Sequence, residues 1–229
     1  MNSIKGKARL TGFILIAGML AGILSIAPVI DAPDFLIKAS GHAKQVIFEA
    51  LSQFLLSASY LGVAIILYPI LKKFNESLAL GFLSFRIAEA VFVSIGAVIL
   101  VLILRLSQEF ITATPKDLSY FQVLGNLLRT GRDLVNHVFM ILALSIGCLM
   151  FYVVLFRARL VPAWLSVWGF LGTVMTMFAS LLVLFHSIDI ITPLYIILNI
   201  PTALAEILLA IWLIFKGLDK AILESITET

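Results

Sequence analysis

The stretch LALGFLSFRIAEAVFVSIGAVILVLIL, residues 78–104, decides the fold, because it is apolar almost throughout and its only charged residues are Arg86 and Glu89. A helix needs about 20 predominantly apolar residues to cross the hydrocarbon core of a bilayer. This stretch is therefore long enough to span a membrane. Two charges in the middle of such a segment are costly, so they need partners or a function.

The whole chain has the same apolar character. Of its 229 residues 62% are hydrophobic and 13% are charged, and the mean hydropathy is +1.12. A soluble domain averages about 45–50% apolar and about 25% charged residues, and its interior is too small to hide this much apolar surface. The composition indicates a protein embedded in the lipid bilayer and excludes a soluble enzyme and a nucleic-acid-binding domain. Cys148 is the only cysteine, which excludes an intramolecular disulfide.

Six segments are long and apolar enough to cross a membrane. They cover about residues 10–30, 46–71, 78–104, 134–156, 163–185 and 193–215. We therefore expect a single membrane domain over residues 1–229, an all-α integral membrane bundle of six transmembrane helices. The small residues around Ser25–Ala27 resemble a signal-peptide cleavage site, but Pro28 would follow the cut directly and the apolar run is long, so we interpret it as a retained first span.

The distribution of Lys and Arg predicts the orientation. The side that holds the termini receives Lys5, Lys7, Arg9, Lys72, Lys73, Arg157, Arg159, Lys216 and Lys220. The other side receives the smaller set Lys38, Lys44, Arg105, Lys116, Arg129 and Arg132. Since cytoplasmic loops carry the excess of basic residues, both the N and C termini are predicted to be cytoplasmic.

One longer connection precedes the fourth span. It contains an amphipathic helix over about residues 115–130, where Leu118, Phe121, Leu124 and Leu128 form an apolar stripe. Thr114–Asp117 reads as its capping box. Such a helix can lie in the plane of the outer headgroups, as an outer-interface helix, or it can be a plain extension of the fourth span. The sequence leaves both arrangements open.

Three ionisable residues share one depth near the bilayer middle. Arg86 and Glu89 lie three residues apart, on one face of the third span. Glu206 in the sixth span lies about 15 Å from the same cytoplasmic boundary. We therefore expect Arg86 to bridge Glu89 and Glu206, with the third and sixth spans adjacent. The cluster can be a structural clamp, or a site that binds an anionic group, a proton or an ion.

A proline and further polar residues accompany this cluster. Pro201 should kink the sixth span, and its freed carbonyls together with Asn199 could line a small polar cavity. A second polar layer nearer the outside is expected from Glu49 and Gln53 of the second span with Asn136 and His137 of the fourth.

The sequence gives little support for metal or cofactor chemistry. A metal site could draw only on His137, Glu49 and either His186 or His42, and a haem would need facing axial histidines that are missing. We expect no metal, no cofactor and no catalytic residue.

Several of these residues carry a resemblance to a known family. The chain resembles a bacterial family of small multi-span membrane proteins called domain of unknown function 4386 (DUF4386). The resemblance rests on Phe85–Ala90, on Pro162–Leu165, and on Ile200–Pro201 followed by Glu206, Trp212–Leu213 and Lys216–Gly217. It implies a multi-pass protein of the bacterial cytoplasmic (inner) membrane and marks Arg86, Glu89 and Glu206 for testing. It supplies no substrate.

Three functions are compatible with these observations. The favoured one is binding or transport of a small molecule, lipid or ion at the Arg86, Glu89 and Glu206 cluster. The alternative is a non-catalytic membrane sensor, regulator or partner protein, in which the cluster is a structural clamp. An enzyme acting on lipid is least favoured, because no nucleophile or metal set accompanies the cluster. The expected partner is the lipid bilayer, with a small ligand and no nucleic acid.

Overall fold

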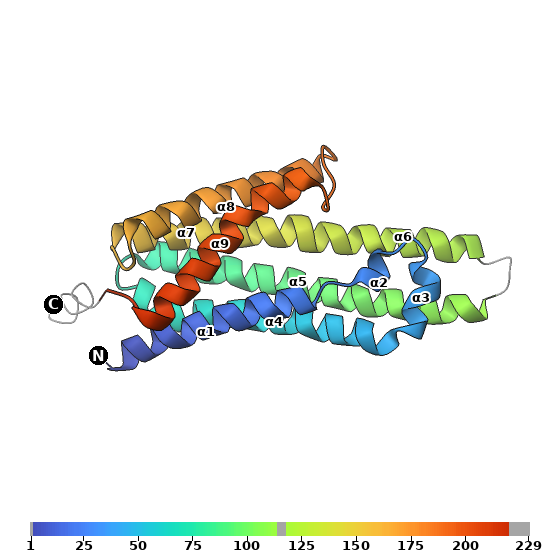
Figure 1. The fold of residues 1–229 in the computed structure, drawn as a ribbon, viewed down its shortest axis with the longest axis horizontal. Helices are drawn as coiled ribbons and strands as arrows, with labels where there is room; N and C mark the ends of the chain where they lie inside the picture. The colour runs from blue at the N-terminus through green and yellow to red at the C-terminus, as the bar shows by residue number, and fades with distance from the viewer. Residues whose placement is uncertain (1, 114–117, 220–229) are drawn as a thin grey trace.

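The computed structural model describes residues 2–113 and 118–219, and the elements in these two ranges are helices (Figure 1). They are α1 (Asn2–Leu24), α2 (Pro28–Asp31), α3 (Phe35–Gly41), α4 (Ala43–Leu71), α5 (Glu76–Thr112), α6 (Leu118–Leu134), the π-helical turn η1 (Val135–Phe139), α7 (Met140–Arg157), α8 (Ala163–Leu184) and α9 (Pro193–Phe215). No strand occurs in either range.

Six helical stretches of these residues are long and apolar enough to cross a membrane, which confirms the six-span prediction. They are Ile4–Asp31, Ala43–Leu71, Glu76–Thr112, Ser119–Arg157, Ala163–Leu184 and Pro193–Phe215. The ends agree closely with the sequence-based limits in the second, fifth and sixth spans. They differ in the first, third and fourth.

The first span is interrupted near its end. α1 stops at Leu24 and the short helix α2 begins at Pro28, which is the first residue of that helix. Proline lacks an N–H group and disfavours helical conformation in the residue before it, and Ala27 has φ −113° and ψ 69°. The chain therefore leaves the helical path at residues 25–27 and bends before it reaches Asp31.

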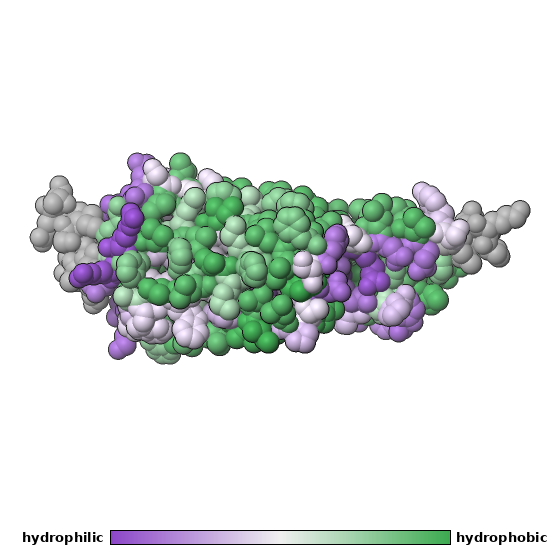
Figure 2. Space-filling view, turned by 90° about the horizontal axis from the view of Figure 1, so that it is seen from above, coloured by the Kyte–Doolittle hydropathy of each residue, from purple (hydrophilic) through white to green (hydrophobic). Residues whose placement is uncertain are grey.

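The third and fourth spans are much longer than the membrane requires. α5 has 37 residues and the continuous helix Ser119–Arg157 has 39, which at about 1.5 Å per residue gives more than 50 Å each. The hydrocarbon core is about 30 Å thick. Figure 2 shows a hydrophobic band between two hydrophilic zones. α5 and α6 project past the ends of the other helices (Figure 1). The projecting end lies opposite the chain termini (Figure 1).

The amphipathic helix before the fourth span belongs to this projection. α6 is followed directly by η1 and α7, with no intervening loop, so the segment extends the fourth span rather than forming a separate helix. Its side chains Phe121 and Leu128 pack against an outer apolar core. Thr114–Asp117, the capping box expected from the sequence, lie outside the described residues.

The six spans form a closed ring. Each span packs against the next one in the chain, in the order α1, α4, α5, α7, α8, α9, and α9 packs against α1. α9 crosses the front of the bundle obliquely (Figure 1). Gly217, just after α9, lies near Lys5 and Ala8, so the first and last described helices meet at one end of the molecule.

The expected adjacency of the third and sixth spans is wrong. In the described part of the chain α5 packs extensively against α4 and α7, and α9 against α8 and α1, so α5 and α9 face each other across the ring. The reason is geometric: when every span packs on its neighbours in the sequence, the third span is separated from the sixth by two helices on either side.

The buried apolar side chains form two clusters along the ring. The inner cluster, toward the termini, includes Leu67, Phe82 and Leu155. The outer cluster includes Phe35 and Leu100. Ser52, Gln53 and Ser57 of α4 and Arg86 and Glu89 of α5 are buried between these two clusters, so the middle of the ring is polar.

Two glycines allow α9 to close the ring. A Cβ atom at Gly12 of α1 would lie 2.6 Å from the Ala210 carbonyl oxygen, and one at Gly172 of α8 would lie 2.9 Å from the Pro201 carbonyl carbon. Both contacts are with backbone atoms, which cannot move aside as a side-chain end can. These helices approach each other closely because the glycines have no side chain, as in many membrane bundles.

We predict that Gly12→Ala destabilises the protein by about 1–3 kcal/mol, because the added methyl group forces α1 and α9 apart. Gly62→Ala is the matched control, since a Cβ at Gly62 meets no atom within 4 Å. Alanine there should be neutral or slightly stabilising. Thermal unfolding in detergent measures both, and equal melting temperatures for the two variants would contradict the close α1–α9 contact.

Candidate functional site

Arg86 and Glu89 form an ion pair inside the ring. Both side chains belong to α5, and each residue is only 3% exposed. Arg86 Nη1 donates to Glu89 Oε2 at 2.9 Å and to Oε1 at 3.1 Å. Because the two residues are three apart in one helix, their side chains meet on one face. This pair lies within a single helix and therefore cannot by itself join two spans.

Arg86 also contacts three neighbouring side chains. Its Nη2 donates to the Sγ atom of Cys148 on α7 at 3.1 Å. The guanidinium carbon lies 5.0 Å from the centre of the Tyr60 ring and 5.5 Å from that of Phe82. Aromatic faces attract cations, so these rings stabilise a charge that has left water. The contacts with Cys148 and Tyr60 connect α5 to α7 and to α4.

Glu206 occupies a different position from the one expected. Its Oε2 accepts a hydrogen bond from the Tyr60 hydroxyl at 2.9 Å, and the residue is partly exposed. The ion pairs found among the described residues do not include one between Arg86 and Glu206, so the expected direct bridge is wrong. Glu206 is close enough to interact electrostatically with Arg86. Tyr60 of α4 stands between the two, because α5 and α9 lie across the ring.

The residues around the α9 proline pack against α8. The Trp168 indole N–H donates to the Pro201 carbonyl at 2.9 Å. Asn199 donates from its amide to the Tyr195 carbonyl, one turn earlier in the same helix, at 2.8 Å. Thr176 and Thr202 share a hydrogen bond of 2.7 Å between α8 and α9. Asn199 lies about two helical turns before Glu206 in α9. Its side chain bonds its own helix and does not join the Arg86 cluster.

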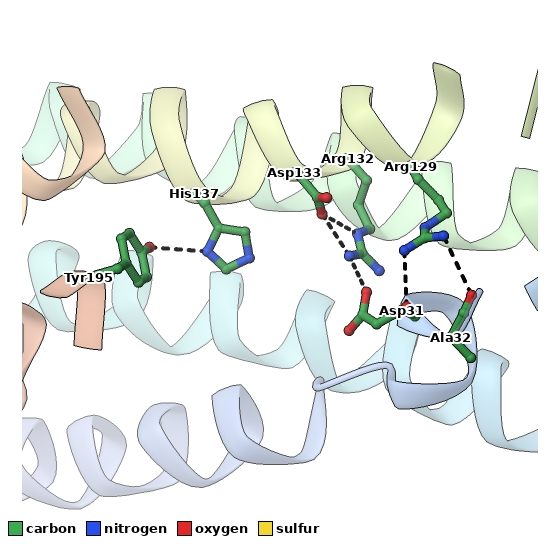
Figure 3. A network of polar contacts seen from close by, with 7 residues as sticks. All are labelled: Asp31, Ala32, Arg129, Arg132, Asp133, His137 and Tyr195. Atoms are coloured by element: carbon green, nitrogen blue, oxygen red, sulfur yellow. Dashed lines mark hydrogen bonds and ion pairs between the residues drawn. The ribbon is translucent and has the colours of Figure 1, made fainter. Parts of the chain in front are cut away.

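The second polar layer lies in the outer half of the ring. Glu49 Oε1 accepts from the Gln45 amide at 2.9 Å. His137 Nδ1 lies 3.2 Å from the Tyr195 hydroxyl (Figure 3). Gln53, Asn136 and His137 line one cavity, although they come from α4 and η1. The structure thus brings three of the four expected residues to one wall, with Glu49 one helical turn from Gln53.

A charged network that the sequence did not indicate lies beside this layer. Figure 3 shows Arg132 between two carboxylates: its Nη2 donates to Asp31 Oδ1 at 2.5 Å and to Asp133 Oδ1 at 2.6 Å. Arg129 donates to the backbone carbonyls of Asp31 and Ala32. These contacts fasten α2 to α6. Asp31 lies far from Arg132 in the chain, so spacing alone could not have revealed the pairing.

The described residues contain no group of three His, Cys, Asp or Glu side chains arranged to hold a metal ion. His42, one of the histidines considered from the sequence, lies with Nδ1 2.9 Å from the Lys38 carbonyl oxygen.

The six apolar helices and the polar interior define a multi-pass integral membrane protein. Residues 10–217 match the family model described as "Domain of unknown function (DUF4386)". The match covers most of the chain, and the protein belongs to this family. No curated protein and no solved structure matches the chain significantly.

We predict that Glu89→Gln and Glu206→Gln differ strongly in stability. Glu89→Gln leaves the Arg86 guanidinium buried without its paired carboxylate, which should cost about 3–5 kcal/mol. Glu206→Gln retains an oxygen that can accept from Tyr60, so the loss should stay below about 1 kcal/mol.

Unfolding in detergent, followed by tryptophan fluorescence, provides the comparison. A larger loss in Glu206→Gln than in Glu89→Gln would mean that Glu206, rather than the α5 ion pair, holds the bundle together.

Proposed function

We propose that this protein carries a small ion or molecule across the membrane, with Glu206 as the group that exchanges a proton or a monovalent cation. The observation that supports it is the charge composition of the cluster. One guanidinium, Arg86, is paired with Glu89, and within the described ranges a second carboxyl group, Glu206, has only a neutral hydroxyl as its hydrogen-bond partner.

The surplus carboxyl group is expensive when it is ionised. A charged side chain at the bilayer centre costs at least about 2.5–3.5 kcal/mol, and intramembrane carboxyl groups frequently belong to ion or proton pathways. Arg86 is already engaged by Glu89 and by Cys148. Glu206 therefore binds a proton or a cation in its resting state.

Pro201 provides a point at which α9 can bend. It lies five residues before Glu206 and removes one hydrogen bond from the helix interior. The Trp168 indole donates to the Pro201 carbonyl, and Thr176 holds the next residue, Thr202, by a hydrogen bond. Release of these contacts would let the two halves of α9 move relative to each other, which changes the exposure of Glu206.

Reconstituted protein tests this proposal through ion flux. Liposomes loaded with a pH-sensitive dye and given an inside-negative potential should acidify faster with the wild-type protein than without it, or should take up ²²Na⁺ faster from a sodium gradient. Glu206→Gln should return both fluxes to the rate of empty liposomes, because its amide neither binds a proton nor carries a charge.

Glu109→Gln is the control for that experiment. Glu109 is an exposed carboxylate on the projecting end of α5, so its removal should leave the flux unchanged. Wild-type liposomes that pass neither protons nor sodium faster than empty ones would contradict transport.

One observation favours the second candidate, a non-catalytic sensor, regulator or partner protein. The contacts of the cluster connect four helices, since Tyr60 lies on α4, Arg86 on α5, Cys148 on α7 and Glu206 on α9. A clamp of this kind would stabilise the bundle without binding a ligand. It is the expected conclusion if flux is absent and Glu206→Gln lowers the melting temperature.

We further propose that the protein lies in the bacterial cytoplasmic membrane with both termini inside. The basis is the excess of Lys and Arg in the loops on the side of the termini. Both ends of the described chain meet at one end of the bundle, which is compatible with that orientation.

Reporter fusions in a bacterial host check this orientation. Green fluorescent protein fused to the C-terminus should fluoresce, since it folds only in the cytoplasm. Alkaline phosphatase fused after Ser187, in the loop between α8 and α9, should be active, because that loop is then on the oxidising side. A dark C-terminal fusion together with an inactive phosphatase fusion would mean that the topology is the reverse of the one proposed.

A further inference from the structure

A cavity of about 820 Å³ lies at the end of the molecule that holds the chain termini. Its wall is formed by the turn between α7 and α8 together with the end of α9. The volume is within the range of about 300–1,000 Å³ that is usual for small-molecule sites. The cavity shares no residue with the Arg86 cluster, so it is a separate candidate site.

The floor of the cavity is apolar and held in place. Leu160, Val161 and Leu218 line it, and all three are buried in the inner apolar cluster. The Asp219 backbone N–H donates to the Leu160 carbonyl at 3.0 Å, which ties the end of α9 to the turn between α7 and α8. The two parts of the wall are therefore fixed relative to each other without a ligand.

The charged part of the wall is mainly basic. Arg157 at the end of α7, Arg159 in the turn and Lys216 at the end of α9 line the cavity, and all three are exposed. Asp219 is the acidic residue of the lining, so the net charge of the wall is positive. None of the ion pairs between described residues uses these three cations. Their charged groups are accessible, and together they favour an anionic ligand.

The backbone at Arg159 is unusual. The Leu160 N–H donates to the Leu155 carbonyl and the Arg159 N–H to the Phe156 carbonyl, which is the Schellman pattern that ends many helices. The residue in the place of Arg159 is then left-handed, and Arg159 has φ 49°. Glycine is the usual residue there, as at Gly217 after α9 with φ 79°. An arginine in this conformation costs free energy, which indicates that its side chain has a use beyond the turn.

An apolar groove continues from the charged cavity along the outside of the bundle. It has a volume of about 340 Å³ and lies between α7 and α8, where Val153, Phe170 and Leu171 line it. Phe156 and Arg157 line both hollows, so the groove and the cavity meet at these two residues. A ligand that occupies both needs an anionic end and an apolar end.

Tryptophan side chains place this junction at the membrane surface. Trp212 lines the cavity, and Trp164 and Trp168 near the start of α8 are 54% and 44% exposed. Tryptophan is enriched at the level of the lipid headgroups. Figure 2 shows a hydrophilic zone next to the hydrophobic band at this end of the molecule. The cavity therefore lies where headgroups are, and the groove where acyl chains begin.

We propose that this site binds an anionic phospholipid. The lipid phosphate is held by Arg157, Arg159 and Lys216, and one acyl chain lies in the groove against Val153 and Phe170. Basic cavities between membrane helices are suited to acidic headgroups, because each Lys or Arg near the surface adds to the attraction. This binding goes beyond the proposed function and does not depend on transport.

Three probes test the ligand class on the full-length protein in detergent. They are dioleoyl phosphatidylglycerol, dioleoyl phosphatidylcholine and inorganic phosphate, and native mass spectrometry measures the adduct of each. The phosphatidylglycerol should bind at least about 10-fold more tightly than the phosphatidylcholine, which has the same chains but no net charge. Equal binding of the two lipids would overturn the proposal. Phosphate that binds alone and displaces the lipid would assign the cavity to a free anion and overturn it too.

Matched variants locate the bound lipid. Arg159→Gly and Lys216→Gln should each weaken phosphatidylglycerol binding about 5-fold. Arg159→Gly should melt at the wild-type temperature or above it, since glycine relieves the left-handed backbone. Lys73→Gln is the control, because Lys73 is an exposed cation at the same end of the molecule that lines neither hollow. Wild-type lipid affinity in both Arg159→Gly and Lys216→Gln, or an equal loss in Lys73→Gln, would refute the site.

Glu206→Gln separates this proposal from the transport proposal. The variant should bind phosphatidylglycerol with wild-type affinity even if its ion flux is lost. Loss of lipid binding in a folded Glu206→Gln would instead assign the lipid to the Arg86 cluster and overturn the site at the turn between α7 and α8.

Discussion

The 2.9 Å ion pair between Arg86 and Glu89 is the interaction on which the interior of this protein depends. In a bilayer no water is present to satisfy a charge, so a guanidinium in the third span needs partners from the protein itself. It obtains them from its own helix through Glu89, and from the Cys148 sulfur and the Tyr60 ring. The neighbouring helices are therefore held at positions set by the reach of Arg86.

Tyr60 extends this arrangement to the sixth span. The Tyr60 aromatic ring faces the Arg86 guanidinium of α5, and the Tyr60 hydroxyl donates to Glu206 of α9. One residue of α4 therefore contacts two helices that lie on opposite sides of the bundle. A second polar region, with its own unpartnered acceptors, lies toward the outer end of the ring, beside the outer apolar cluster. The ring thus holds a buried ion pair at its middle and buried oxygens without a hydrogen-bond partner farther out.

Much of the architecture could be predicted from the sequence, because lipid imposes simple requirements. A run of about 20 apolar residues must be a helix, so six such runs gave six spans, and Thr192–Pro193 marked the start of α9. The rarity of charges in these runs also singled out Arg86, Glu89 and Glu206. The length of α5 was missed because its projecting turns leave the apolar core, where the hydrophobic signal ends, whereas the extension of the fourth span was one of the two arrangements that the sequence left open.

What the sequence by itself determined is the number of spans and the pairing of Arg86 with Glu89, because both depend on positions along a single helix. Only the tertiary structure decided which helices are neighbours. In the folded protein α5 and α9 are not neighbours, Glu206 accepts a hydrogen bond from Tyr60, and Asp31 forms an ion pair with Arg132. These contacts depend on close packing at residues such as Gly12 and on the oblique course of α9, and helix periodicity carries no information about either.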